Sequence, residues 1–389
     1  MADTPATHTA RVVMLAPDLS GHNGRSARMA ASLAAAGHRV TLYVAEGTLR
    51  PESLPDAVEM VACLPPDIDT ARAGAVAIDP DRVVLANADV VQVGGQGTLG
   101  WAARHIPEHA ALVYDAPVDL AVGATESGLK GWGKRKLNEL WSATTEWQRA
   151  RRIDAVLCVS YAFGAFIQRE LKLGRIPVVP IYSALPYREV RPARPTGLHP
   201  SRPKVAVACG DTAQAVHAAR AVANLRDVEL VLINCDLDRD HLEDLPEMEV
   251  LRGRVHHIEV QEADLVATLA AFDMALVLPS DTSQRVLYDI PDVVFACIMA
   301  GLPMVASDLP GIERVVHSQG IGLLTDPGNM EQVADLILRV IKDPDQSKRL
   351  RHNLLLVREH RYNWEAQGTR LLALYDQLLA NRKTRKATV

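Results

Sequence analysis

The first 44 residues alternate between apolar strands and an alanine-rich helix, and this alternation limits the fold more than any other feature. Arg11 to Ala16 is a short apolar run, Pro17 to Gly24 is polar, and Arg25 to Ala36 has helical composition. Gly37 then stops the helix, and Arg39 to Val44 is a second apolar run. A strand, a helix and a strand in this order predict a βαβ unit, whose two strands are parallel.

Further short apolar runs continue the pattern through the first half of the chain. They lie at residues 58–63, 90–93, 111–114, 155–159 and 177–181. Helical or polar segments separate them, which favours a mostly parallel sheet covered by helices. The first half is therefore predicted to be a doubly wound, Rossmann-like α/β domain.

A second alternation of the same kind follows a stretch rich in Pro and Arg. Residues 187–203 show no apolar periodicity and indicate a linker. The predicted organisation is a domain over 1–186, a second doubly wound domain over 204–363, a helix over 364–380 that crosses back to the first domain, and a flexible tail over 381–389. Because parallel sheets bind ligands at the carboxyl ends of their strands, we expect the two domains to face a central cleft.

Composition and charge exclude several classes of protein. The 42 Lys and Arg against 47 Asp and Glu give a net charge of −5, which offers no case for a nucleic-acid partner. The longest apolar run, Val293 to Ala306, is too short to span a membrane, and Met1 to Ala10 lacks the pattern of a secretory signal. The five cysteines are scattered without a C-x-x-C pair, so we expect reduced thiols in a cytoplasmic protein without integral membrane association.

The polar segment after the first strand is a candidate anion site. Gly21, His22, Asn23 and Gly24 lead into a helix whose N-terminal N–H groups can hold an anion. Their spacing is not G-x-G-x-x-G, and no acidic residue clearly closes the second strand, which disfavours a nicotinamide dinucleotide site. A tight strand-to-helix turn explains the glycines equally well.

The most specific signature lies in the second half. A helix ends in Ala300-Gly301-Leu302-Pro303, the next strand ends in a loop at Pro310-Gly311, and Gly322-Leu323-Leu324 leads to Pro327-Gly328. This arrangement resembles the nucleotide-sugar domain of the retaining GT-B glycosyltransferases, in which A-G-L-P, a Pro-Gly loop and G-L-L-x-x-P-G follow one another. The first helix and residues 152–160 resemble the same family, so the likeness covers nearly the whole chain.

The resemblance implies an activity and a set of donor residues. It implies transfer of a sugar, with retention, from a nucleotide-diphosphate sugar to a small-molecule or glycan acceptor, with the first domain on the acceptor side. No metal or other cofactor is expected, because basic side chains and helix N-termini stabilise the leaving diphosphate. The candidate donor-binding residues are Gly21, Gly24, Gly210, Asp211, Thr212, Arg285, Tyr288, Pro310, Gly311, Ile312, Glu313 and Arg314. Among them, Arg285, Glu313, Arg314 and the backbone of Gly210 to Thr212 are expected to compensate for family contacts that this chain lacks.

Other candidates lie near the ends of strands in the first domain. Many relatives place a His or Asp where the transferred sugar binds, and Asp115, Asp119 and His22 are the corresponding catalytic candidates. The candidates for acceptor binding are Asn23, Gly94, Gly95 and Gln96. Turn geometry explains Gly94 and Gly95 equally well.

The chain also departs from the family pattern. Ala296 and Tyr288 stand where the family usually has Glu, Val293 stands where Lys is frequent, and Asp211 to His217 replace an expected Arg and Lys. The alternative hypothesis is therefore a catalytically degenerate GT-B protein that binds or activates a partner enzyme. A sugar-nucleotide epimerase or phosphorylase shares the architecture, but none of their catalytic segments is found. In the basic stretch Leu129 to Trp141, packing on the sheet is favoured over weak peripheral contact with anionic lipid.

Overall fold

The protein is described by a computed structural model that covers residues 9–16, 19, 21–64, 78, 83–118, 152–238, 242–280 and 284–387. Within these ranges, the side chains of residues 21–23, 96–97, 284–285 and 383–387 are not described. The chain divides into two compact units. Residues 1–183 and 367–389 form the first unit, and residues 184–366 form the second.

The first unit contains a seven-stranded sheet in the order β3-β2-β1-β4-β5-β6-β7, and every neighbouring pair is parallel. Its elements are β1 (Arg11–Leu15), α1 (Gly21–Ala35), β2 (Arg39–Ala45), β3 (Val58–Leu64), β4 (Val90–Gly94), α2 (Gln96–His105), β5 (Ala111–Asp115), β6 (Ile153–Cys158), α4 (Tyr161–Glu170) and β7 (Val178–Pro180). The central strands β1, β4, β5 and β6 are rich in aliphatic residues and are buried on both faces, as a covered parallel sheet requires, whereas the edge strands β3 and β7 are partly exposed.

The second unit repeats this plan with a six-stranded parallel sheet in the order β10-β9-β8-β11-β12-β13. Its elements are β8 (Lys204–Ala208), α5 (Thr212–Ala223), β9 (Glu229–Ile233), α7 (Pro246–Val250), β10 (Val255–Ile258), α8 (Glu262–Leu269), β11 (Met274–Val277), α9 (Gln284–Tyr288), α10 (Asp292–Ala300), β12 (Met304–Ser307), α11 (Pro310–Val316), β13 (Gly322–Thr325), α12 (Met330–Lys342) and α13 (Pro344–His360). The prediction of two doubly wound, Rossmann-like α/β folds is confirmed.

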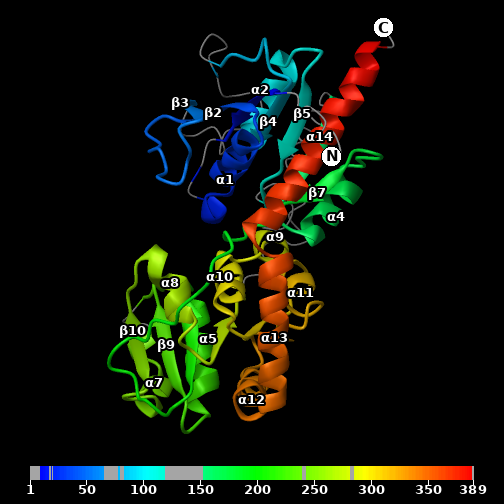
Figure 1. The fold of residues 1–389 in the computed structure, drawn as a ribbon. Coiled ribbons are helices and arrows are strands. Elements are labelled where there is room, and N and C mark those ends of the chain that lie inside the picture. Colours follow the sequence, from blue (N-terminus) through cyan, green and yellow to red (C-terminus); the bar gives the residue numbers. More distant parts are fainter. Residues whose placement is uncertain are drawn as a thin grey trace, which may run out of the picture. The chain divides into compact units, whose positions relative to one another are not determined.

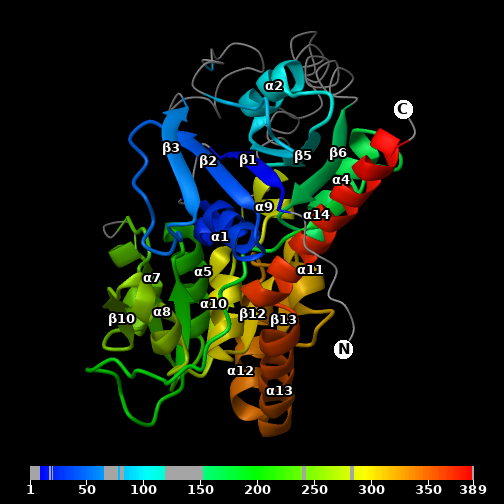
Figure 2. The same cartoon turned by 45° about the horizontal axis from the view of Figure 1, so that its top comes forward.

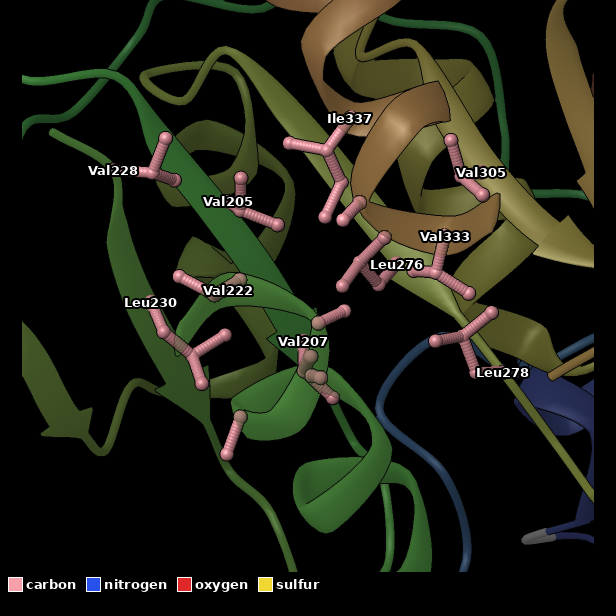
Figure 3. Close-up of a cluster of buried hydrophobic side chains, with 14 of the residues drawn as sticks. Val205, Val207, Val222, Val228, Leu230, Leu276, Leu278, Val305, Val333 and Ile337 are labelled. Atoms are coloured by element: carbon pink, nitrogen blue, oxygen red, sulfur yellow. The ribbon is translucent and has the colours of Figure 1, made fainter. Parts of the chain in front are cut away.

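The core of the second unit is a layer of aliphatic side chains between the sheet and two helices. Figure 3 shows Val205 and Val207 of β8 and Leu276 of β11 lying opposite Val222 of α5 and Ile337 of α12. Val205, Leu276 and Ile337 are at most 2% exposed. This packing fixes the start of α5 against the end of β8, where the candidate donor residues lie.

The last helix, α14 (Trp364–Ala387), begins in the second unit and continues into the first. In the first unit it lies along β7 and α4 (Figures 1 and 2), and the hydroxyl of its Tyr375 donates to Gln92 Oε1 of β4 at 2.6 Å. The helix runs to Ala387, through most of the segment predicted as a flexible tail. Lys and Arg are good helix formers and interact favourably with a helix C-terminus.

Three boundaries differ from the sequence expectation. Helix α1 begins at Gly21, so the predicted polar turn partly forms the first helical turn. The predicted Pro-Gly loop is the start of α11, because Pro310 occupies the first helical position, where its missing N–H costs nothing. Residues 187–203, predicted as a linker, belong to the second unit, where Ala193 N donates to Ala267 O at 2.9 Å.

Candidate functional site

Each sheet has a point where the strand order reverses, and ligands of such sheets bind at the carboxyl ends beside that point. In the first unit it lies between β1 and β4, and in the second between β8 and β11. The candidate residue Gly94 ends β4 and Gly95 follows it, and Gly210 and Asp211 follow β8. These candidates therefore lie at the carboxyl edge of the sheet in their own unit.

In the second unit, a sharp turn joins β8 to the N-terminus of α5. Cys209 has a φ of 53°, and a Cβ on Gly210 would lie 3.0 Å from Val207 Cγ1, so the turn leaves little room for a side chain. The Asp211 carboxylate caps α5 by accepting from Gln214 N at 2.9 Å. Thr212 Oγ1 accepts from Asp238 N at 2.7 Å, which ties this turn to the loop after β9.

Asp211 therefore has a structural role at the position predicted to bind the donor. A carboxylate at a helix N-terminus stabilises the helix and places negative charge where an anionic ligand would bind. The backbone N–H groups at the start of α5 are of the kind that can hold an anion at a helix N-terminus.

The candidates on α9 and α11 divide into packing residues and exposed residues. A Cβ on Gly311 would lie 2.7 Å from Tyr288 O, so Gly311 allows the end of α9 to approach α11. Ile312 is fully buried, which leaves only its backbone for a ligand. Pro310, Glu313 and Arg314 are exposed, and Tyr288 is half-buried.

The position where the family usually has Glu lies in the core. Ala296 is 4% exposed on α10, between the buried Phe295 and Cys297. Ser307 Oγ, at the end of β12, donates to Pro279 O after β11 at 2.8 Å, so the hydroxyl at this edge links two strand ends.

The five cysteines differ in burial. Cys63, Cys158 and Cys297 are buried, whereas Cys235 is half-buried and Cys209 is exposed at the turn after β8. Burial raises the pKa of Cys158 and of Cys297 to about 12, so neither thiol forms the nucleophilic thiolate near neutral pH. Burial also raises the pKa of Cys209, despite its exposed surface.

At the edge of the first sheet, glycine conformations explain several candidates. Gly24 has a φ of 66° within the first turns of α1, and Gly95 has a φ of 82° at the N-cap of α2. Both angles favour glycine over other residues. Thr98, fully buried, donates to Gly95 O at 3.0 Å and fixes the turn after β4.

Asp115 lies at the carboxyl end of β5, as predicted, but it is buried in an ion pair. Arg25 Nη1 donates to both carboxylate oxygens of Asp115, Oδ1 at 2.6 Å and Oδ2 at 2.7 Å. Asp115 is 8% exposed and Arg25 is 5% exposed. From the sequence, Arg25 is expected only to open a helix. Its place directly after Gly24, as one of two arginines in a helix of mostly small residues, is the sequence signal for this pair.

Several candidates lie outside the described part of the structure. Asp119 and the basic stretch 129–141 are among the undescribed residues. His22, Asn23, Gln96 and Arg285 are described in backbone only, each in the first turns of a helix. Their assigned roles stay predictions.

Two cavities in the described ranges lie away from these edges. One of about 410 Å³ is lined by α5, α7 and α12, including Arg220 and Glu247. The other, of about 330 Å³, lies between the start of β6 and α14 and includes Asp154 and Arg382. No group of three or more metal-binding side chains occurs in the described ranges, and no described helix is long and apolar enough to cross a membrane.

A family model matches most of the second unit, and solved structures of known proteins match the fold of nearly the whole chain. Residues 212–354 match the family described as Glycosyl transferases group 1, from the start of α5 into α13. A sucrose-phosphate synthase from Thermosynechococcus elongatus superposes with a TM-score of 0.68 at 16% identity, covering 96% of this chain and 100% of that one. The chain has the GT-B fold.

Other relatives agree with this assignment. Anabaena HepE in complex with UDP-glucose has a TM-score of 0.63 at 16% identity, covering 95% of this chain and 100% of that one. WaaG, a glycosyltransferase involved in lipopolysaccharide biosynthesis, has a TM-score of 0.64 at 15% identity over 93% and 99%. An alpha-D-kanosaminyltransferase from Streptomyces kanamyceticus is 24% identical over 161 residues, which span 41% of this chain and 40% of the relative.

Proposed function

We propose that this GT-B protein is a glycosyltransferase that moves a sugar from a nucleotide-diphosphate sugar to a small-molecule or glycan acceptor, with retention at the anomeric carbon. The observation that carries the proposal is the position of the family match. It begins at Thr212, at the turn where α5 starts beside the point of strand reversal in the second sheet. This is the place where parallel sheets bind nucleotides.

The donor diphosphate is proposed to bind across the turn at Gly210 and the start of α5. Backbone N–H groups and the helix dipole there offer partial positive charge to the phosphates. The exposed Arg314, and Arg285 in the first turn of α9, supply the full positive charges that stabilise the leaving nucleotide diphosphate. The Asp211 carboxylate opposes them, so the two arginines are more important here than in a site with a basic residue at position 211.

The names of the relatives suggest which donors to test first. HepE was solved with UDP-glucose, and the curated relative is named an alpha-D-kanosaminyltransferase. Nucleotide-activated hexoses and amino hexoses are therefore the proposed donor class. Metal-independent transfer stays a prediction.

The proposal is tested by thermal melting with UDP, GDP, ADP and dTDP, followed by nucleotide release from the matching sugar nucleotide. A nucleotide at 100 times its Kd stabilises the folded protein by about 2.7 kcal/mol, so one of the four should raise Tm by several degrees. Arg314→Ala should weaken nucleotide binding by roughly tenfold or more, because it removes a charge-assisted contact. Arg349→Ala, which removes an equally exposed arginine on α13, is the matched control and should leave binding unchanged.

A second candidate function is a catalytically degenerate GT-B protein that binds or activates another enzyme. The specific observation in its favour is the donor edge itself, where Ala296 is buried in the core and Asp211 is committed to capping α5. This candidate predicts no Tm change with any nucleotide and a stable complex with a protein partner. Stabilisation by a nucleotide, with release of that nucleotide from its sugar donor, would exclude it.

A further inference from the structure

The ion pair of Arg25 and Asp115 is too costly to be an incidental feature of the first unit. Both side chains are removed from water, and such a pair is stable only where its geometry is good and the remaining donors are satisfied. One guanidinium nitrogen contacts both carboxylate oxygens at hydrogen-bond distance. The carboxylate is therefore held by Arg25 and offers little exposed surface to a substrate.

The other donors of Arg25 reach the ends of two further strands. Its Nε donates to Ile181 O at 2.8 Å, directly after β7, and its Nη2 lies 3.5 Å from Cys158 O, the last residue of β6. Asp115 is the last residue of β5. One side chain thus joins the start of α1 to three successive strand ends at the carboxyl edge of the sheet.

Arg25 also sits at the point where α1 needs support. The preceding residue, Gly24, has a φ of 66°, so the first turn of the helix is not held by regular helical geometry. That turn contains His22 and Asn23, the catalytic and acceptor-binding candidates. Arg25 is the first side chain after it that is anchored in the core.

The same arginine holds the segment by which the chain leaves the first unit. Ile181 lies two residues before the unit boundary at Ser183. Its neighbours are held by α14, because Tyr182 N donates to Gln367 Oε1 at 3.3 Å and Arg370 Nη1 donates to Pro180 O at 2.9 Å. The first turn of α1 and the exit segment are therefore tied to each other through Arg25.

We propose that Arg25 and Asp115 form a positioning pair, which sets the first turn of α1 against the ends of β5, β6 and β7 for the transfer reaction. This inference rests on the proposed function. It assigns Asp115 to placing the acceptor-side turn through Arg25, in place of a catalytic residue that touches the sugar.

The kinetic test compares Asp115→Asn and Arg25→Lys with the wild-type protein. Misplacing reacting groups by about 1 Å costs roughly a hundredfold in rate, so kcat should fall by about that factor and the acceptor KM should rise. The Kd of the donor nucleotide should change far less than kcat, because the proposed diphosphate contacts at Gly210 and Arg314 lie in the second unit and only Gly21 and Gly24 of the donor candidates lie in this turn. Tyr375→Phe is the matched control, since it removes a buried hydrogen bond to Gln92 elsewhere in the same core. It should lower Tm and leave kcat and KM unaltered.

A double variant separates positioning from folding. Arg25→Met with Asp115→Leu leaves no unpaired buried charge, so the protein should fold with near wild-type stability. It should nevertheless transfer sugar as slowly as the single variants. Wild-type kcat and KM in this double variant, or equal kinetic losses in Tyr375→Phe, would overturn the proposal.

Hydrogen exchange supplies a readout that does not depend on transfer. Amides of residues 21–29 should exchange faster in Asp115→Asn and in the double variant than in the wild type, and should be unchanged in Tyr375→Phe. Unchanged exchange in the first two would refute the positioning role even if the protein transfers no sugar. Failure to bind any nucleotide with these exchange differences intact would instead refute the proposed function alone.

Discussion

The buried side chain of His38 makes the stability of the first unit depend on pH. His38 is 9% exposed, and its Nδ1 accepts a hydrogen bond from Ala10 N at 3.3 Å, which requires a neutral ring at that nitrogen. Burial lowers the pKa of His38 below its usual value, against a smaller opposing effect of Asp376. The unfolded chain therefore binds a proton more readily than the folded chain between the lowered pKa and about 6.5.

This shift predicts an acid-sensitive stability. As the pH falls from 7.5 to 5.5, the unfolded state gains a proton at His38 first, so the free energy of unfolding should decrease, with a limiting slope of about 1.4 kcal/mol per pH unit for one group. His38→Asn keeps an acceptor for Ala10 N and should reduce the decrease. Urea unfolding of both proteins at the two pH values measures the difference, and equal losses in the two proteins would contradict this assignment.

A side chain at Gly311 should lower the stability of the second unit. Gly311→Ala places a methyl group against the backbone carbonyls of Tyr288 and Asp289, which cannot move as a flexible side chain can. Overpacking of this kind costs roughly 1–3 kcal/mol. Gly328→Ala is the control, because this glycine is exposed and the added Cβ would meet only the Asp326 side chain, at 3.3 Å. Chemical unfolding should rank Gly311→Ala well below both the wild type and the control, and equal stabilities would be the contrary result.

Helices and strands are predictable from the sequence where the periodicity of apolar residues agrees with the residues that end an element, such as glycine and proline. The alanine-rich run before Gly37 and the Ala-Gly-Leu-Pro stop at Gly301 locate the C-terminal ends of α1 and α10, since Gly301 adopts the left-handed helix end with a φ of 67°. The sequence does not reveal the start of α1 or the helix at Pro310, because glycine and proline are typical of loops and open helices at these two positions. The Arg25 contacts were beyond reach, since they join residues up to 156 positions apart.

Asn363 links α13 to α14, and its replacement should lower the stability of the protein. Its Nδ2 donates to the carbonyls of Arg358 and Glu359 at the end of α13, and its Oδ1 accepts from Ala366 N at the start of α14. Asn363→Ala should lower the free energy of unfolding by about 2–4 kcal/mol, because it removes a cap and leaves partly buried backbone groups unsatisfied.

Asn329→Ala is the control against which the loss of unfolding free energy in Asn363→Ala is compared. Asn329 is exposed and caps only α12, through Gln332 N at 3.0 Å, so its removal should cost about 1 kcal/mol. Thermal and urea unfolding of both variants provide the comparison. A loss for Asn363→Ala no larger than that for Asn329→Ala would show that the side chain does not join α13 to α14.

At the scale of the whole molecule, the repeated parallel sheet was predictable and the chemistry of its edges was not. Short apolar runs determine the strands, and right-handed connections between parallel strands leave few topologies. The side chains at the strand ends serve either packing or ligands, and composition does not distinguish the two. Ile312 is a fully buried packing residue within a motif predicted to bind the donor, whereas Arg314, two positions later, is exposed.

The most direct test of the account is hydrogen exchange with and without the nucleotide that raises Tm. Because the proposal places the diphosphate at the start of α5 and beside α11, amides of residues 209–215 and 310–316 should exchange more slowly in the complex. The amides lining the cavity between α5 and α7, at residues 246–250, should be unaffected. Protection confined to that cavity, or no protection at any residue of the second unit, would contradict a donor site at the carboxyl edge of the second sheet.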